Sequence, residues 1–337
     1  MGKTLGLDLG SAYTKFCIHD EKDARMTPSV ITVDKKSDRV IASGNEAKAM
    51  IGRAPSSLEV IRPIKNGLVD DVDAAALLLT DLLDRTESSS VFGRTAIVAT
   101  IPFGVDKETR TLSSVIQDTG ISTYEFVYTP IAIAFGTGMP VDIPTGRMIV
   151  DIGAGHSDAA IISHGDVVLS SIINTAGNTM TEAIRNYIIE NHGIEVGELT
   201  AEAIKLKIAT LDPRAPLKSV KIFGKVRADK NPKFENKITA GAVITSKELI
   251  PVLTPCVDRI IENIVYALKS MPTEIAADVT NFGILLSGGG AALNGLPAYV
   301  EKALRIKANV SKTPQADAVR GLLEIINGGR SYAKYTH

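Results

Sequence analysis

The chain has 337 residues, of which 45% are hydrophobic and 22% are charged, and its formal net charge is -1 at pH 7. This composition is typical of a soluble globular protein with about two domains, and the near-zero charge excludes a field that draws proteins to nucleic acid. The two cysteines, Cys17 and Cys256, exclude a disulfide framework and a zinc pattern. The N-terminus is too short and polar for a signal peptide, so we expect a cytoplasmic protein.

The first half of the chain alternates predicted strands with predicted helices. Residues 4–9 and 13–18 are predicted as two strands joined by a turn at Gly10, because apolar residues run up to the glycine and resume after it. Further strands are predicted at 29–33, 95–101 and 123–128, and helices at 73–84, at 105–119 and from Pro130 to about Phe135. Glycines and prolines cluster over residues 136–144, which predicts a crossing between domains.

The pattern then restarts in the second half. Strands are predicted at 148–152, 158–162, 167–173 and 282–287, and helices at 179–191, over 257–268 and from about Pro297. Thr200 is predicted to cap a further helix with Glu202 in its first turn, and Thr245 with Glu248 forms a predicted capping box. Residues 212–242 are rich in Lys, Pro, Asn and Gly, which predicts a small peripheral β-rich subdomain.

Two segments of the chain share one layout. LGLDLGSAYTKFCI near the start and VDIGAGHSDAAII from Val150 both consist of a strand, Asp-x-Gly, a turn and a second strand. Strands that alternate with helices favour an α/β fold. The repeat is explained most simply by a chain folded as two similar halves.

The paired turns predict a phosphate site. A glycine turn between strands directs several backbone N–H groups into one concavity, which binds phosphate, and Gly10 and Gly153 let the backbone approach closely. Asp8 and Asp151 would lie beside the phosphates, where Mg²⁺ would relieve their repulsion. One such turn is more often a plain hairpin, but two in matching places, with SGGG after a third buried strand, favour a nucleotide.

Other sequence motifs narrow the class of nucleotide-binding fold. No G-x-x-x-x-G-K-[ST] occurs, which excludes a P-loop, and no G-x-G-x-x-G opens a helix after the first strand, which disfavours a dinucleotide fold. His156, within the second turn, is interpreted either as a donor to phosphate or as a solvated turn residue.

The chain resembles bacterial actins of the MreB type, within the actin, sugar-kinase and heat-shock-chaperone ATPase superfamily. The resemblance rests on GLDLGSAYTK, GNEAKAMIGRAP, IRPIKNGLVDDVDA, PIAIAFGTGMPVDIPTGRMIVDIGAG, GELTAEAIKLKI, ADVTNFGILLSGGGAALNGLPAYV and AVRGL, in that order. It implies an α/β, actin-like duplicated ribonuclease-H-like fold, with two domains around a cleft that holds ATP and Mg²⁺. Domain I would comprise residues 1–139 and about 310–337, and domain II residues 140–309 with a small subdomain at about 178–245.

The same resemblance implies the residues of the site. The phosphate turns would be formed by Gly10, Ser11, Ala12 and Tyr13 and by Gly153, Ala154 and Gly155. Ribose and base would meet Glu202 and Lys205, which by themselves would be interpreted as a solvated helix face. The adenosine loop would be formed by Gly288, Gly289, Gly290 and Ala291. Mg²⁺ would be held, through water, by Asp8 and Asp151.

Three residues depart from the family pattern. Lys15 stands where MreB proteins are apolar and actin has lysine, and it is predicted either to reach a β- or γ-phosphate or to face solvent. Thr129 replaces the glutamate that orients the attacking water, which predicts slow hydrolysis or hydrolysis that relies on another group such as Asp158 or His156. Asn178 replaces a common aspartate near the γ-phosphate.

The resemblance implies a filament-forming cytoskeletal ATPase that serves cell shape. Its main partner would be further copies of itself. Val91 and Phe92 would bind a membrane surface reversibly or pack on their own domain, and nothing indicates nucleic-acid binding. The alternatives are a filament that aligns magnetosomes or segregates plasmids, a small-molecule kinase of the superfamily, for which no carboxylate base is evident, and a chaperone-type switch.

Overall fold

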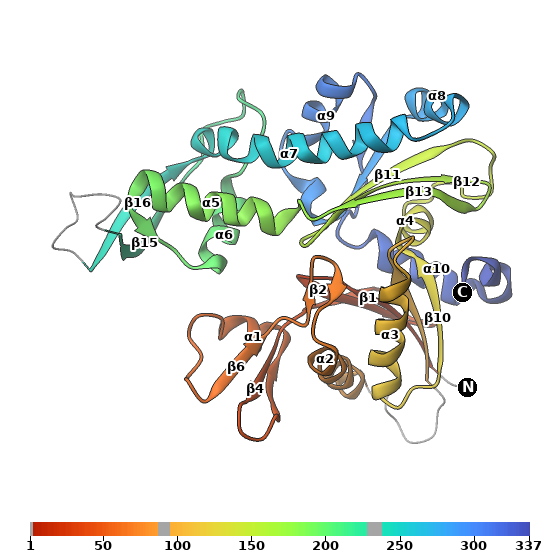
Figure 1. Cartoon of the computed structure of the whole chain (residues 1–337), viewed down its shortest axis with the longest axis horizontal. Coiled ribbons are helices and arrows are strands. Elements are labelled where there is room, and N and C mark those ends of the chain that lie inside the picture. The colour runs from red at the N-terminus through yellow and green to blue at the C-terminus, as the bar shows by residue number, and fades with distance from the viewer. Residues whose placement is uncertain (1–2, 87–94, 228–237) are drawn as a thin grey trace.

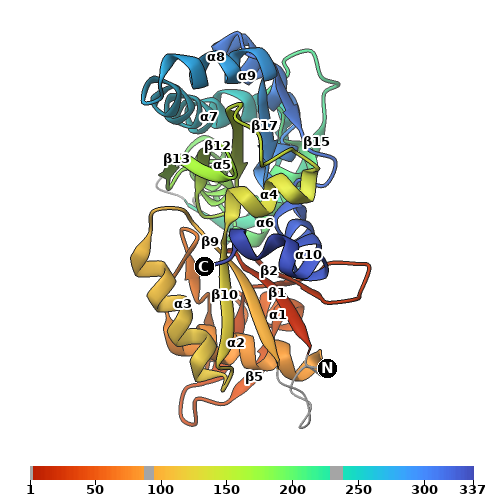
Figure 2. The ribbon, with the colours of Figure 1, turned by 90° about the vertical axis from the view of Figure 1, so that its right-hand side faces the viewer.

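The computed structural model describes residues 3–86, 95–227 and 238–337. It consists of two lobes, each built on a five-stranded sheet (Figure 1, Figure 2). Lobe I comprises residues 4–137 and the helix α10 (Asp317–Gly328), and lobe II comprises residues 147–310.

The sheet of lobe I has the strand order β10-β9-β1-β2-β3. β1 pairs antiparallel with β2 and parallel with β9, which in turn pairs parallel with β10. Apolar runs form these strands, so that Leu5, Leu7 and Ile97 are almost fully buried. The strands are β1 (Thr4–Leu9), β2 (Tyr13–Ile18), β3 (Arg25–Pro28), β9 (Ala96–Ile101) and β10 (Thr123–Tyr128).

The sheet of lobe II repeats this arrangement with the order β13-β12-β11-β17-β18, which corresponds to β3-β2-β1-β9-β10 in lobe I. β11 pairs antiparallel with β12 and parallel with β17, as β1 pairs with β2 and β9. The internal repeat expected from the two Asp-x-Gly segments is therefore present in the pairing of the strands. The strands are β11 (Arg147–Ile152), β12 (Ser157–Ser163), β13 (Asp166–Ile173), β17 (Ile284–Ser287) and β18 (Ala308–Val310).

Helices pack on both sheets. In lobe II, α7 packs on β12 and β13, α8 on β11 and α9 on β18, whereas in lobe I α3 packs on β10 and on α2. Thr245 and Glu248 form the expected capping box at the start of α7. The helices, besides α10, are α1 (Gly44–Ala49), α2 (Val72–Arg85), α3 (Asp106–Asp118), α4 (Thr129–Thr137), α5 (Gly177–His192), α6 (Glu198–Ile208), α7 (Ser246–Lys269), α8 (Thr273–Phe282) and α9 (Leu296–Leu304), with 3₁₀ segments η2 (Gly289–Ala292) and η3 (Gly329–Tyr335).

Two helices, α4 and α10, lie between the sheets (Figure 2). α4 packs on β11 and β12 of lobe II as well as on β9 and β10, and α10 packs on β1, β2 and β9. The two helices cross where Gly136 meets Asp317 and Gly321 meets Ala132, so closely that a Cβ on either glycine would collide with the backbone carbonyl of the other helix. Glycine at both positions therefore sets the separation of the helices that join the lobes.

Three smaller sheets extend the lobes. β4 (Ile31–Asp34), β5 (Val40–Ser43) and β6 (Leu58–Ile61) form one sheet of lobe I. A two-stranded hairpin follows, made of β7 (Ile64–Lys65) and β8 (Leu68–Val69). In lobe II, β14 (Ile194–Glu195) pairs with β15 (Ser219–Val226), which pairs with β16 (Thr239–Thr245).

One local expectation is confirmed with a shifted start, and another is wrong. The strand expected at 29–33 is β4, which begins at Ile31. Ser29 lies between β3 and β4, where it is fully buried and donates its hydroxyl to the carbonyl of Gly10 at 2.6 Å. Helix α6 starts at Glu198 after Gly197, not at Thr200. The early start places the carboxylate of Glu198 in the first turn, where the helix dipole favours a negative charge.

Within the described part of the chain, no helix combines the length and the apolarity needed to cross a bilayer. Val91 and Phe92, the expected membrane contact, lie outside the described residues.

Candidate functional site

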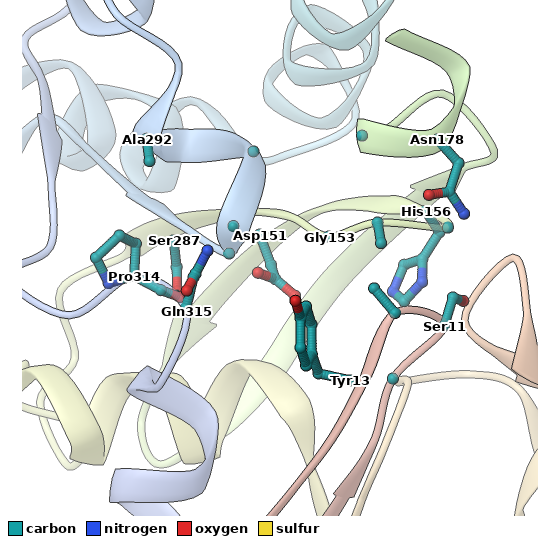
Figure 3. Close-up of a pocket in the computed structure, with 18 of the residues that line it drawn as sticks. Ser11, Tyr13, Asp151, Gly153, His156, Asn178, Ser287, Ala292, Pro314 and Gln315 are labelled. Carbon is teal, nitrogen blue, oxygen red and sulfur yellow. The ribbon is translucent and has the colours of Figure 1, made fainter. Parts of the chain in front are cut away.

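A pocket of about 430 Å³ lies between the lobes, at the ends of β1 and β11. Figure 3 shows Ser11, His156 and Asn178 gathered at one end of it and Ala292 with Pro314 at the other. The volume lies in the range of small-molecule sites. The two similar halves of the fold thus meet at one cavity.

The first turn, between β1 and β2, lines the pocket with Gly10, Ser11, Ala12 and Tyr13. The N–H of Gly10 donates to the carbonyl of Tyr13 at 3.2 Å, which closes the turn, and a Cβ on Gly10 would lie 2.8 Å from that carbonyl oxygen. Glycine is therefore required here by the tightness of the turn.

The second turn, between β11 and β12, is built in the same way and lines the pocket with Gly153, Ala154, Gly155 and His156. The N–H of Gly153 donates to the carbonyl of His156 at 3.0 Å. The first residues of α5 pack on this turn, because the N–H of Asn178 donates to the carbonyl of Ala154 at 2.7 Å. A helix N-terminus beside a glycine turn favours an anion.

The β7–β8 hairpin joins the two turns. Its tip, Asn66–Gly67, has positive φ at both residues, as a two-residue hairpin loop requires. The N–H of Gly67 donates to the hydroxyl of Ser11 at 2.8 Å, and a Cβ on Gly67 would collide with the imidazole of His156. A Cβ on Gly155 would collide with the hydroxyl of Ser11 and the backbone of Asn66. Lobe I and lobe II therefore touch at this end of the pocket, with a glycine on each side of the contact.

The two predicted carboxylates, Asp8 and Asp151, both line the pocket. Asp8 accepts a hydrogen bond from Lys15 Nζ at 2.6 Å and another from the hydroxyl of Thr100 at 3.0 Å. Burial opposes the charge of Lys15, but the carboxylate of Asp8, together with those of Asp151 and Asp317, outweighs it and raises the pKa of Lys15. Lys15 thus faces the pocket and not open solvent, and in this structure its partner is Asp8.

Asp151 is less well compensated than Asp8. Burial raises the pKa of Asp151 to about 6, and the charge of Asp8 adds to this effect while Lys15 opposes it. A further carboxylate contributes as well: Asp317 is fully buried and accepts hydrogen bonds from Ser287 at 2.8 Å and Thr313 at 2.9 Å. Around Lys15, the three carboxylates of Asp8, Asp151 and Asp317 therefore form a local excess of negative charge that an added cation would offset.

The donor set fits Mg²⁺ only together with a phosphate. Among residues 3–86, 95–227 and 238–337, no three or more Asp, Glu, His or Cys side chains converge as metal ligands. Mg²⁺ accepts this arrangement, since it usually takes one or two carboxylates, several waters and the phosphate oxygens of a nucleotide.

The other end of the pocket is lined by the predicted adenosine loop. Gly288, Gly289 and Gly290 line the pocket, but Ala291 is buried away from it, and Ala292 and Leu293 line the wall in its place. The 3₁₀ turn of η2 causes this difference, because it directs successive residues to different sides.

Glu202 and Lys205, on one face of α6, also line the pocket, and both have partners in the protein. Lys205 Nζ donates to the carbonyl of Gly177 at 2.6 Å and contacts the hydroxyl of Thr181 at 2.8 Å, which ties α6 to α5. Burial lowers the pKa of Lys205. Glu202 pairs with Lys48 of lobe I at 3.1 Å.

The structure separates the groups expected to assist hydrolysis. Thr129 and His156 line the pocket, whereas Asp158, on β12, is buried and accepts a hydrogen bond from Ser170 of β13 at 2.7 Å. Thr129 donates its hydroxyl to the carbonyl of Ile101 at 3.1 Å, which leaves the oxygen lone pairs free to accept. Burial lowers the pKa of His156, so its imidazole is neutral at pH 7.

Asp158 is expected to make the stability of the protein depend on pH. Burial raises the pKa of Asp158 to about 7, so the folded state holds this proton more tightly than the unfolded state does. The free energy of unfolding should therefore fall as the pH rises from about 4 to about 7. Asp158→Asn should be more stable than the wild type at pH 8 by roughly 2 kcal/mol, with a smaller difference at pH 5. Urea unfolding at both pH values tests this, and equal differences would contradict it.

Sequence reasoning missed three parts of the site. Asp317 directly precedes AVRGL, the last stretch of the family resemblance, which begins at Ala318. Its hydrogen-bond partners come from β17 and from the loop before α10. The β7–β8 hairpin has strands of two residues, too short for a periodic pattern, although its Asn-Gly dipeptide is a hairpin signal. Lys48 gives no local signal, because its partner Glu202 belongs to the other lobe.

Comparisons with known proteins agree with this geometry. The model of the MreB/Mbl protein family matches residues 2–333. The cell shape-determining protein Mbl of Bacillus subtilis (strain 168) is 32% identical over 313 residues, which cover 93% of this chain and 92% of Mbl.

Solved structures share the whole fold. The crystal structure of MreB 5 of Spiroplasma citri bound to AMPPNP matches with a TM-score of 0.91 and 26% identity, over 99% of this chain and 98% of that one. The subunit of the MamK double helical filament matches with a TM-score of 0.79 and 24% identity, over 96% and 98% of the two chains, a likeness that concerns the fold alone. The predicted two-domain, actin-like α/β fold is thereby confirmed, and the chain belongs to the MreB/Mbl protein family.

Proposed function

We propose that the protein is an ATP-dependent bacterial actin homologue that binds ATP with Mg²⁺ between its lobes and assembles into cytoskeletal filaments that serve cell shape. The observation that carries the proposal is the convergence of two similar glycine turns, one from each sheet, on a single pocket that contains Asp8 and Asp151. The relative named as cell shape-determining covers nearly the whole chain, and MreB 5, at 26% identity, was crystallised with AMPPNP.

In this proposal the triphosphate lies between the two turns. Backbone N–H groups of Ser11 and Ala12 on one side and of Ala154 and Gly155 on the other would bind its oxygens, with the N-terminus of α5 adding a favourable dipole. Bound Mg²⁺ would neutralise phosphate charge beside Asp8 and Asp151. Once bound Mg²⁺ offsets the charge of Asp8, Lys15 would turn from Asp8 toward a phosphate. The adenosine would extend toward Gly288–Gly290, with Glu202 at the ribose.

A ligand between the turns would hold the lobes together, because each turn belongs to a different sheet. We propose domain I as residues 1–139 with about 310–337 and domain II as residues 140–309, so that α4 and α10 form the connection about which the domains turn. When the lobes close on the nucleotide, surfaces at opposite ends of the molecule would be presented to further copies. A head-to-tail contact between copies that does not form a closed ring produces an open filament. The cytoplasm is the proposed location, as for a cytoskeletal filament.

Sedimentation with ATP and Mg²⁺ followed by electron microscopy tests the proposal. ATP-dependent pelleting and filaments on the grid are the expected result. A protein that remains monomeric with ATP and Mg²⁺ and phosphorylates a sugar would contradict the filament and support a kinase of the same superfamily.

Hydrolysis is expected to be limited by Thr129. Its hydroxyl is a weak base, so Thr129→Glu should raise the steady-state rate of phosphate release about 10- to 100-fold by positioning and activating water. Thr129→Gln is the matched control, since it has similar size and no base. An equal gain in both variants, or no gain in either, would contradict this role of the position. Unchanged turnover in Thr129→Ala would exclude a role for the native hydroxyl and leave His156, which His156→Ala tests.

A further inference from the structure

Two ion pairs connect the lobes on the side of the pocket where α1 faces α6 (Figure 1). Lys48, on α1 of lobe I, pairs with Glu202 of α6 at 3.1 Å. Arg62, which follows β6 of lobe I, pairs with Glu198 of α6 at 2.5 Å. Both carboxylates belong to one helix of lobe II, and both cations belong to the small sheet region of lobe I.

The spacing of the two glutamates explains how one helix serves both contacts. Glu198 and Glu202 are four residues apart, which places them on the same face of α6. Two like charges at this spacing repel one another within a helix. Lys205 of the same helix interacts favourably with both carboxylates, and the cations of lobe I add to that compensation, so closing the lobes further stabilises this face of α6.

Burial distinguishes the Lys48–Glu202 pair from an ordinary surface pair. The side chains of Lys48 and Glu202 are 24% and 27% exposed, and those of Arg62 and Glu198 are 28% and 41% exposed. The side chains of Lys65 and Asp70, an ion pair within the β7–β8 region, are 63% and 48% exposed. Burial opposes the charge of Lys48, but Glu202 and Tyr13 together outweigh it and raise the pKa of Lys48. Partial removal from water strengthens the attraction relative to an exposed pair.

Lys48 also contacts the first phosphate turn. Its Nζ lies 3.4 Å from the phenol oxygen of Tyr13 and 5.2 Å from the centre of the Tyr13 ring. Tyr13 and Glu202 both line the pocket from opposite lobes. One ammonium group therefore connects a side chain of the phosphate turn with the carboxylate expected at the ribose.

We propose that Lys48, Arg62, Glu198 and Glu202 form an interlobe clasp that opens for a nucleotide to leave, and that Lys48 is a positioning residue that holds Glu202 toward the ribose. This inference rests on the proposed nucleotide site. Because Lys48 engages one carboxylate oxygen of Glu202, the other is left to accept from a ribose hydroxyl. In this proposal the nucleotide leaves when the lobes separate, and that separation breaks both pairs.

The first test measures the release of fluorescent mant-ADP by stopped flow. Arg62→Glu and Glu198→Arg should each accelerate release about 3- to 10-fold, and the double variant, which restores the pair in reverse, should return to within about twofold of the wild type. Arg85→Glu, which breaks an ion pair with Asp81 inside α2 of lobe I, is the matched control and should leave the rate unchanged. Single variants that release at the wild-type rate, or a double variant as fast as the singles, would overturn the clasp.

The second test separates positioning from simple structural support. Lys48→Met should reduce the preference for ADP over 2′-deoxy-ADP about 3-fold or more, whereas Lys48→Arg should keep most of it. An unchanged preference in Lys48→Met would overturn the positioning role even if release accelerates. Thermal unfolding of each variant establishes that it is folded. If the wild type does not bind mant-ADP at all, both the nucleotide site and the clasp are refuted. If the wild type binds but the variants behave as it does, only the clasp is refuted.

Discussion

Asp151→Asn is expected to weaken the binding of Mg²⁺–ATP by about 100-fold, the scale on which removal of one partner of a buried charged contact acts. The carboxylate of Asp151 lies in the pocket at the end of β11, where burial raises its pKa to about 6. An ionised carboxylate in this buried position is favourable only when a cation is near. Asparagine keeps the shape of the side chain but supplies no charge to Mg²⁺. Calorimetric titration of both proteins with Mg²⁺ and a non-hydrolysable ATP analogue measures the difference.

The control for this substitution lies directly opposite in the sheet. Asp158 pairs with Asp151 in the register of β11 and β12 and is also buried, but it does not line the pocket. Asp158→Asn should therefore bind Mg²⁺–ATP within about twofold of the wild type. Equal weakening in both variants would show that the effect comes from the sheet and not from the ligand. Wild-type affinity in Asp151→Asn would remove this carboxylate from the site.

Gly321→Val is expected to lower the free energy of unfolding by about 3 kcal/mol or more. A Cβ at this position would collide with the carbonyl of Ala132 on α4, and backbone, unlike the end of a side chain, has no rotamer with which to yield. The two helices would have to separate, which opens the core where Ile131, Val319 and Leu322 pack. Because α4 carries Thr129 and Ile133 in the wall of the pocket, nucleotide binding should weaken as well.

Urea unfolding monitored by circular dichroism tests this prediction. Gly197→Ala is a control at a glycine with open space around it and a φ of -70, and it should change the free energy of unfolding by at most about 1 kcal/mol. Similar stability of Gly321→Val and the wild type would mean that the helices do not cross as closely as described.

The sequence predicts the repeated parts of the fold well, for a physical reason. Asp8 and Asp151 each end a buried apolar strand and precede a glycine turn, so the local chemistry is complete within a dozen residues. Their pocket-lining position follows from that local pattern and from the pairing of similar halves. The β7–β8 hairpin gives only a weak local signal, since its tip is shaped by Ser11 and His156 of two different turns.

The rest of the site depends on contacts between distant segments. The side chain of Asp317 is buried because Ser287, thirty positions earlier, donates to it. The family resemblance predicts that Glu202 contacts a ligand, and in the structure Glu202 also pairs with Lys48. The pattern of residues along α6 cannot predict this partner, because Lys48 belongs to the other lobe. Thr200 satisfies the composition rule for a helix cap, but α6 begins earlier, and residue preference alone does not fix the start.

Isothermal titration of the wild-type protein with AMPPNP and Mg²⁺ tests the central claim most directly, because it asks whether the two turns bind one nucleotide between the lobes. The expected result is saturable heat with a stoichiometry of one nucleotide per chain, together with a higher melting temperature that requires Mg²⁺. Absence of heat and of any thermal protection at saturating nucleotide would contradict the proposed site, and with it the coupling of ATP to filament assembly.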